Sequence, residues 1–310
     1  MAKRYWRNRA ILAKIETTYG QDSAPTAAAN AMQMTNVEFD PSAGQEVARD
    51  LVLPYMGHQG VMLVGSYGTL SGEVELAGAG AAGTVPAYGV LLRACAMREV
   101  VTAGADVQYS PVSKNQESCS IRFNGDGVQH ILLGCRGTFT LDLAPLAIPR
   151  LKFVFTGLLG QVTDLAMPTT IDLTKFIKPV PVNKANTTFA LHGYAGGTDG
   201  ISFDLGNQIE PDFLIGEEAI EHVDRMMTGE ATIRADSLST INWYDRSANH
   251  TPGPLAGQHG ITAGNIVKFD ASQVQIGRPK YGESRKRINN RLPFFCLPTA
   301  GNDEFLLTIK

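Results

Sequence analysis

The chain has 310 residues, of which 44% are hydrophobic and 18% are charged, and it contains 32 glycines and 16 prolines. This length exceeds the usual size of one hydrophobic core, so we expect two domains, and the excess of turn formers over charge favours many short strands over a helical bundle. The formal net charge of −3 at pH 7 lacks the basic excess of a general nucleic-acid binder, and the apolar fraction argues against disorder.

Residues 1–35 are predicted to form an N-terminal arm. The arm opens with a basic stretch that includes Arg4, Arg7 and Arg9, and it continues into a glycine-, proline- and alanine-containing segment too poor in apolar residues to fold alone. It has no apolar core of the kind found in a secretory signal, and no run of eighteen apolar residues follows, so we expect neither secretion nor insertion into a membrane.

Strand signals begin at Asn36 and recur along the first half of the chain. Residues 86–97 interrupt them and read as a helix with Pro86 in its first turn. The expected strands lie near residues 37–40, 51–53, 61–64, 71–77, 107–109 and 119–124.

The stretch from Gly125 to Gly157 predicts two strands joined by a turn. Polar and apolar residues alternate from Thr138 to Leu143, and after two prolines Leu151, Phe153 and Phe155 fall on one face of a second strand. We interpret this stretch as a half-buried antiparallel sheet that carries no catalytic group.

The second half of the chain repeats the first weakly but in the same order. After a proline-containing linker at residues 166–184, we predict two copies of one β-rich domain, at residues 36–165 and 185–310. The matched segments are 37–40 with 201–204, 72–77 with 229–234, 137–142 with 264–270, and 150–153 with 291–294.

One motif has the outline of a dinucleotide-binding loop: Gly78, Gly80 and Gly83 form GxGxxG between a strand and a helix. The strand before it carries Glu73 and Glu75, whereas a strand covered on both faces should be nearly all apolar. No alternating strand–helix pattern follows, so we interpret the motif as a flexible glycine-rich loop and expect no cofactor.

The remaining polar residues do not form a catalytic or metal-binding pattern. The six histidines and four cysteines lack metal-ligand spacing, and the thiols are expected to be buried in a reducing cytoplasm. An acidic region at Asp199, Asp204, Glu210 and Asp212 has the ligand type for calcium, but a solvated turn is the simpler interpretation. We therefore predict no enzymatic activity and no metal site.

A basic cluster near the C-terminus is a candidate contact surface. It would suit either phosphate or an acidic neighbouring subunit. Its members are Arg278, Lys280, Arg285, Lys286 and Arg287.

Three segments together resemble the major tail tube proteins of long-tailed, non-contractile bacteriophages. These are residues 11–20 (ILAKIETTYG), the segment PAYGVLLRACAM, and the stretch from Phe123 to Gly157 with LLGCRG and IPRLKFVFTG. The resemblance covers residues 11–160 well, and the second half matches only through the internal repeat.

The resemblance implies a mainly β fold of two tandem β-sandwich domains, each with a flanking helix, that contribute to a continuous β-barrel tube. It implies stacked rings in the virion tail, assembled in the host cytoplasm, through which DNA passes transiently and without sequence specificity. Expected partners are further copies of the chain, a tape measure protein in the lumen, and tail terminator and distal tail proteins at the ends. Two domains per chain would give trimeric rings with pseudo-sixfold symmetry.

Within that picture, two residue sets receive structural roles. Arg4, Trp6, Arg7 and Arg9 would belong to an arm that contacts a neighbouring ring. Glu73, Glu75 and Thr232 would line the channel, because a passage for DNA should avoid unpaired cations; an outer solvated face is the alternative.

A different class of function remains open, namely a carbohydrate- or receptor-binding β-sandwich of the virion. Sugar platforms usually need several exposed aromatic residues, and Trp6 and Trp243 are the only tryptophans in the chain.

Overall fold

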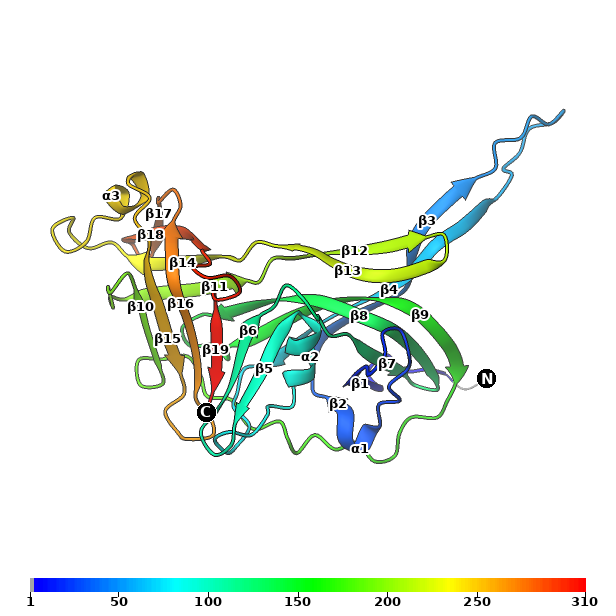
Figure 1. Cartoon of the computed structure of the whole chain (residues 1–310), viewed down its shortest axis with the longest axis horizontal. Helices are drawn as coiled ribbons and strands as arrows, with labels where there is room; N and C mark the ends of the chain where they lie inside the picture. Colours follow the sequence, from blue (N-terminus) through cyan, green and yellow to red (C-terminus); the bar gives the residue numbers. More distant parts are fainter. Residues whose placement is uncertain (1–2) are drawn as a thin grey trace.

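The computed structural model describes residues 3–310 and is built almost entirely of antiparallel strands (Figure 1). Its first half contains β1 (Arg9–Ile15), α1 (Ala27–Asn30), β2 (Ala31–Met32), β3 (Thr35–Ala48), β4 (Val61–Glu75), α2 (Gly89–Ala94), β5 (Met97–Thr102), β6 (Asp106–Pro111), β7 (Cys119–Gly125), β8 (Val128–Leu143) and β9 (Arg150–Asp164). The second half contains β10 (Thr187–Leu191), β11 (Thr198–Asp204), β12 (Asn207–Leu214), β13 (Glu217–Arg225), β14 (Thr228–Arg234), α3 (Trp243–Ala248), β15 (Gly253–His259), β16 (Val267–Ile276), β17 (Lys280–Ser284), β18 (Arg287–Cys296) and β19 (Leu306–Ile309).

The two halves use the same order of strand pairing. In the first half the order is β3-β4-β9-β8-β7-β1. In the second half it is β11-β14-β18-β16-β15-β10. The helices α2 and α3 occupy the same place in the two chain orders: α2 lies between β4 and β7, and α3 lies between the corresponding strands β14 and β15.

Strands from the two halves also pair with each other. The end of β8 pairs with β11, and the C-terminal strand β19 pairs with β16 on one side and with β6 on the other. Within residues 3–310, all strands except β12 and β13, which form a separate two-stranded sheet, therefore share one extended sheet. The short strands β2, β5 and β10 have one partner each, and so do β3, which pairs only with β4, and β17, which pairs only with β18. β3 and β17 are the edges considered below. These two unpaired edges lie at opposite ends of the molecule in Figure 1.

The core lies on one face of this sheet because the strands alternate. One row of directly paired residues runs through Val74, Leu151, Leu141, Phe203, Gly229 and Phe294, and its five larger side chains are all buried. The sites predicted to match, Leu151/Phe153 and Leu292/Phe294, are fully buried in both halves.

Two long hairpins give the molecule its shape. The β12–β13 hairpin leaves the second half and lies along the first half, whereas the outer part of the β3–β4 hairpin projects away from the body (Figure 1). Gly206 at the base of β12 has φ +67°, and an added Cβ there would lie 2.1 Å from the Met226 carbonyl oxygen, so the bend at this base requires glycine.

The predicted N-terminal arm is wrong for residues 9–15. This segment is β1, which pairs with β7 along all seven residues, and Ala10, Ile11, Leu12 and Ala13 are buried. Four consecutive apolar residues are the signature of a strand covered on both faces, and the basic residues around them obscured it.

Two further expectations differ in detail. The helix predicted over residues 86–97 is confined to Gly89–Ala94, because residues from Met97 onward join β5. The segment 264–270 was matched with 137–142, but Phe139 pairs with Phe153 as Ile276 pairs with Phe294, so Ile276 is the counterpart of Phe139.

Candidate assembly surfaces

The face of the shared sheet opposite the core is a continuous polar surface. One row of directly paired residues runs through Glu75, Arg150, Asp142, Ser202, Glu230 and Pro293. The next row runs through Glu73, Lys152, Thr140, Asp204, Thr228 and Phe295. We call these two rows the polar face; they carry five acidic and two basic side chains.

On the polar face, Arg150 is paired with a carboxylate. The Arg150 guanidinium lies 2.9 Å from the Glu73 carboxylate, which also accepts a hydrogen bond from Asn36. Burial opposes ionisation of Glu73, but the hydrogen bonds from Arg150 and Asn36 outweigh it and lower the pKa of Glu73. Burial and the nearby Glu73 charge raise the pKa of Asp142. Thr232 lies on the same face of β14, paired with Arg291.

The β12–β13 hairpin is held on the first half by a polar clamp. The Arg136 guanidinium on β8 donates to the Ile220 carbonyl at 2.7 Å and to the Glu221 carboxylate. The Tyr19 ring stacks under Arg136, with 4.9 Å from guanidinium carbon to ring centroid, and its hydroxyl accepts from the Ile220 amide at 2.6 Å. The clamp therefore joins the second half's hairpin to two separate segments of the first half.

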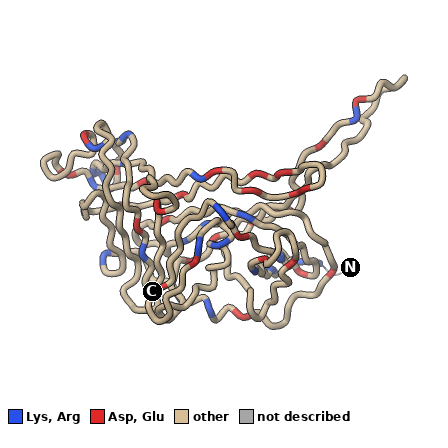
Figure 2. Tube along the Cα trace, viewed as in Figure 1, with Lys and Arg blue, Asp and Glu red and all other residues tan. Residues whose placement is uncertain are grey.

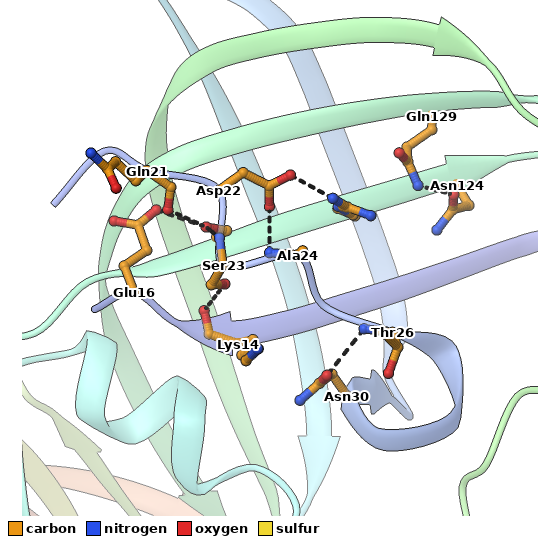
Figure 3. A network of polar contacts seen from close by, with 12 residues as sticks. Lys14, Glu16, Gln21, Asp22, Ser23, Ala24, Thr26, Asn30, Asn124 and Gln129 are labelled. Carbon is orange, nitrogen blue, oxygen red and sulfur yellow. Dashed lines mark hydrogen bonds and ion pairs between the residues drawn. The ribbon is translucent and has the colours of Figure 1, made fainter. Parts of the chain in front are cut away.

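Tyr19 is itself positioned by a buried carboxylate. Glu16 accepts hydrogen bonds from the amides of Gly20 and Gly134 and from the hydroxyls of Ser118 and Ser120, at 2.7–2.9 Å. Figure 3 shows Glu16 within the surrounding network of polar contacts. Four donors satisfy the buried carboxylate, which fixes the turn that carries Tyr19.

Side chains at the base of the hairpin supply hydrogen bonds to β8 where its edge has no strand partner. Between the stretches of β8 that pair with β7 and with β11, the Gly137 carbonyl accepts from the Asn207 side-chain amide at 3.0 Å and from His222 Nε2 at 3.2 Å. Burial lowers the pKa of His222 to about 4, and the nearby Arg136 and Arg225 charges act in the same direction. His222 is therefore a neutral donor at neutral pH.

The outer β3–β4 hairpin, residues 41–68, is a projecting arm with an apolar surface, which we call the free arm. Its consecutive residues Val61, Met62, Leu63 and Val64 are 40–65% exposed, and Val52 and Met56 near the tip are fully exposed. A monomeric protein rarely exposes such a run, so the free arm is a candidate contact surface.

Charge is separated between the two ends of the molecule (Figure 2). The β12–β13 hairpin carries Glu210, Asp212, Glu217, Glu218, Glu221 and Asp224 against a single arginine, Arg225. At the other end, the five predicted basic residues lie together on and around β17. Arg278, Lys280, Arg285, Lys286 and Arg287 are all exposed, and none forms an ion pair within residues 3–310.

The N-terminal residues predicted for an arm lie against their own chain. Arg4 donates to the Gly125 carbonyl, and Arg9 donates to the Val37 carbonyl while stacking on the Trp6 ring at 4.3 Å. Trp6 remains 69% exposed, and Arg7 is also exposed.

The glycine-rich loop packs closely against the backbone of the second half. The amides of Gly78 and Gly80 donate to Asn265 and Gly264, and a Cβ on Gly78 would lie 2.1 Å from the Gly264 carbonyl oxygen. The motif therefore has a packing role in this fold.

Residues 3–310 contain no group of three or more His, Cys, Asp or Glu side chains placed to hold a metal ion. Asp199 and Asp204 lie on β11 and Glu210 and Asp212 on β12, so the acidic region is strand and not a loop. The four cysteines are free and buried. Among the described helices, none is long and apolar enough to cross a membrane.

The clamp residues Tyr19, Arg136 and His222 were not singled out from the sequence. Each pairs with residues far away in the chain, and nothing local distinguishes an arginine inside a strand pattern. The one available signal was Arg136 itself, a charge within the run LLGCRG on a strand that is otherwise largely apolar.

Comparison with known proteins agrees with this architecture. A family model described as phage tail tube protein matches residues 6–294, nearly the whole chain. No curated protein gives a significant match.

Proposed function

The chain belongs to the phage tail tube protein family and is a structural component of the virion tail, and from this premise we propose that it forms the stacked rings of the tube through which DNA passes into the host. The observation that carries the proposal is the sheet shared by the two halves, which has a polar face on one side and unpaired edge strands at both ends.

The polar face has the chemistry that a DNA passage needs. Its two rows carry Glu73, Glu75, Asp142, Asp204 and Glu230 against Arg150 and Lys152, so the surface is acidic. A wall of net negative charge repels phosphate and leaves DNA free to slide, whereas unpaired cations would bind it. We assign Glu73, Glu75 and Thr232 to the channel wall on this ground.

Ring closure uses the unpaired edges. Within one chain, β11 of the second half adds to the edge of β8 of the first half. The corresponding addition between copies would join β3 of one chain to β17 of the next, and repetition of such a head-to-tail contact closes a ring and removes both edges. The exposed basic residues around β17 would then meet Glu38 and Asp40 on β3 of the neighbour.

The shared pairing order supports a duplicated tube domain, with residues 36–165 and 185–310 as copies and 166–184 as the linker. Gly72 pairs with Phe153 and Val74 with Leu151 in the first half, and Gly229 pairs with Phe294 and Ala231 with Leu292 in the second. Three chains would then complete a pseudo-sixfold ring.

The remaining assignments follow from the tube role. The chain would assemble in the host cytoplasm around a tape measure protein and would meet terminator and distal tail proteins at the tube ends. An inter-ring contact by Arg4, Trp6, Arg7 and Arg9 stays a prediction, supported by the exposed Trp6 ring.

Electron microscopy of the purified full-length chain tests the structural role. We expect stacked rings or tubes with a central lumen. Discrete particles of one or a few chains over a wide concentration range would contradict the proposal and favour a binding module of the virion.

The passage role is tested separately by reversing charge on the polar face. Glu230→Lys should leave tubes intact and slow DNA ejection from reconstituted virions, because it places a cation on the proposed wall. Asp164→Lys, at the far end of β9, makes the same charge change away from the polar face and is the matched control. Equal ejection rates for the two variants would contradict a lumen-facing position.

A further inference from the structure

The β12–β13 hairpin and the free arm occupy equivalent places in the two halves. β11 continues into β12 and β13 into β14 with only two residues between the strands, as the inner parts of β3 and β4 continue into the free arm. β11 and β14 hold the same positions in the second half as β3 and β4 in the first. The hairpin that lies on the neighbouring half and the arm that projects into solvent are thus the same element in two environments.

The hairpin shows what this element does when a neighbour is present. Ile220 on β13 is fully buried, with its backbone held by Arg136 and Tyr19, and the Phe213 ring lies 3.0 Å from the position of a Cβ on Gly65. The hairpin therefore packs on the first half through Ile220 and Phe213.

The free arm touches the hairpin at its base, where Gly65 lies beside Phe213, but its apolar residues 61–64 remain exposed within residues 3–310. Gly229 in the second half corresponds to Gly72 in the first half, 157 positions earlier. By the same offset, Ile220 corresponds to Leu63, whose side chain is 65% exposed. On the sheet, Phe139 and Ile276 differ by 137 positions, so Gln273 takes the place of Arg136. The Leu297 amide donates to the Gln273 carbonyl, as expected if Leu297 takes the place of Thr156, the partner of Arg136.

We infer that the free arm docks on the second half of another copy of this chain, around Gln273, as the β12–β13 hairpin docks on the first half around Arg136. The occupant is a second copy because the edge of β3, beside which the arm lies, is the edge left for the next chain. Phe295, the last residue of the polar face, pairs with Gln275 two residues from Gln273 and is 44% exposed, so an apolar side chain is available at the edge of the receiving surface. This inference rests on the proposed head-to-tail ring.

Paired cysteines test the contact in assembled protein. Leu63→Cys and Gln273→Cys alter two side chains outside the core, and the four native thiols are buried and protected. Treatment of tubes with a short thiol-reactive cross-linker should convert most chains into a covalent ladder on denaturing gels, and either single variant should not.

Two controls separate the possible outcomes. Leu63→Cys with Lys114→Cys places the second thiol at an exposed position of the first half and should give no ladder. Leu214→Cys with Glu217→Cys, which are directly paired at the end of the β12–β13 hairpin, should cross-link within one chain. If tubes form normally but Leu63→Cys with Gln273→Cys gives no ladder, this inference is overturned and the proposed function is not. Failure of the unmodified chain to form rings would overturn the proposed function together with it.

Discussion

Arg136 shows how a single side chain joins the two halves. It is 9% exposed, donates to the Ile220 carbonyl and the Glu221 carboxylate, and stacks on Tyr19. Because its charge is buried, removal of the side chain leaves the Ile220 carbonyl with only a longer hydrogen bond from the Tyr19 hydroxyl at 3.4 Å, and removal of the partners would leave a charge unpaired.

Replacement of Arg136 by alanine should release the β12–β13 hairpin while the rest of the fold remains. Loss of a charged hydrogen bond of this kind costs about 1.5–3 kcal/mol. Hydrogen exchange should rise in residues 207–225 and change little in β8 and β9. Arg278→Ala, which removes an exposed arginine without an ion pair, is the matched control. Unchanged exchange in the hairpin would show that its apolar contacts suffice.

His222 makes docking of the same hairpin depend on pH. Burial lowers the pKa of His222 to about 4, whereas an exposed histidine titrates near 6.5. Above pH 6.5 the ring is neutral in the docked and released states, so docking has its full stability. As pH falls from 6.5 toward 4, the released hairpin takes up a proton that the docked hairpin cannot, and docking weakens.

We therefore expect hydrogen-exchange protection of residues 207–225, corrected for intrinsic exchange rates, to fall between pH 7.5 and pH 5. Arg136, Arg225 and Glu221 also face this site, so a variant that changes only the histidine is needed to isolate its effect. His222→Gln keeps an amide donor for the Gly137 carbonyl without a titrating ring, and its protection should vary less with pH. The same pH profile in both proteins would exclude His222 as the cause.

At the scale of elements, the sequence predicts the strands whose polar and apolar residues alternate, and it misses the elements whose burial depends on residues far away in the chain. The strands 138–143 and 150–156 alternate strictly and lie in the sheet as expected. The β12–β13 hairpin was not predicted, because its buried side chains are scattered among six acidic residues and Pro211. Its burial depends on Arg136 and Tyr19, which no local pattern connects to it.

Two deletions distinguish the structural role of β1 from that of the residues before it. Deletion of residues 1–8 removes exposed contacts of Arg4 and Trp6 and should leave soluble, folded protein. Deletion of residues 1–15 also removes buried Ile11 and Leu12, each worth about 1.5–3 kcal/mol, and leaves the edge of β7 unpaired. That loss approaches the whole stability of a typical domain, so the longer deletion should be insoluble. Soluble protein with unchanged circular dichroism after both deletions would contradict a structural role for β1.

At the scale of the whole molecule, the two halves are held together by strand pairing and not by side-chain packing alone. β11 pairs with β8, and β19 links β16 to β6, so a relative rotation of the halves would break backbone hydrogen bonds at two places. The predicted linker, residues 166–184, therefore does not act as a hinge between independent bodies. A rigid pair of sheets with open edges at opposite ends is suited to a ring of fixed curvature.

Ring symmetry is the prediction that depends on this arrangement most directly. If each chain supplies two tube domains, three chains close the ring, and β4 and β14 take alternate places around one barrel. The two domains differ in ways that a reconstruction can detect: the free arm spans residues 41–68, whereas the β12–β13 hairpin spans 207–225 and ends in a tight turn at Ile215 and Gly216. We expect averaged cross-sections of purified tubes to have threefold symmetry, with a sixfold pattern only at low resolution. Chain mass per ring, measured independently by scanning transmission microscopy, should equal three times 33.3 kDa. True sixfold symmetry with six chains per ring would mean that only one half of each chain builds the wall, and the duplication would then have to serve another purpose.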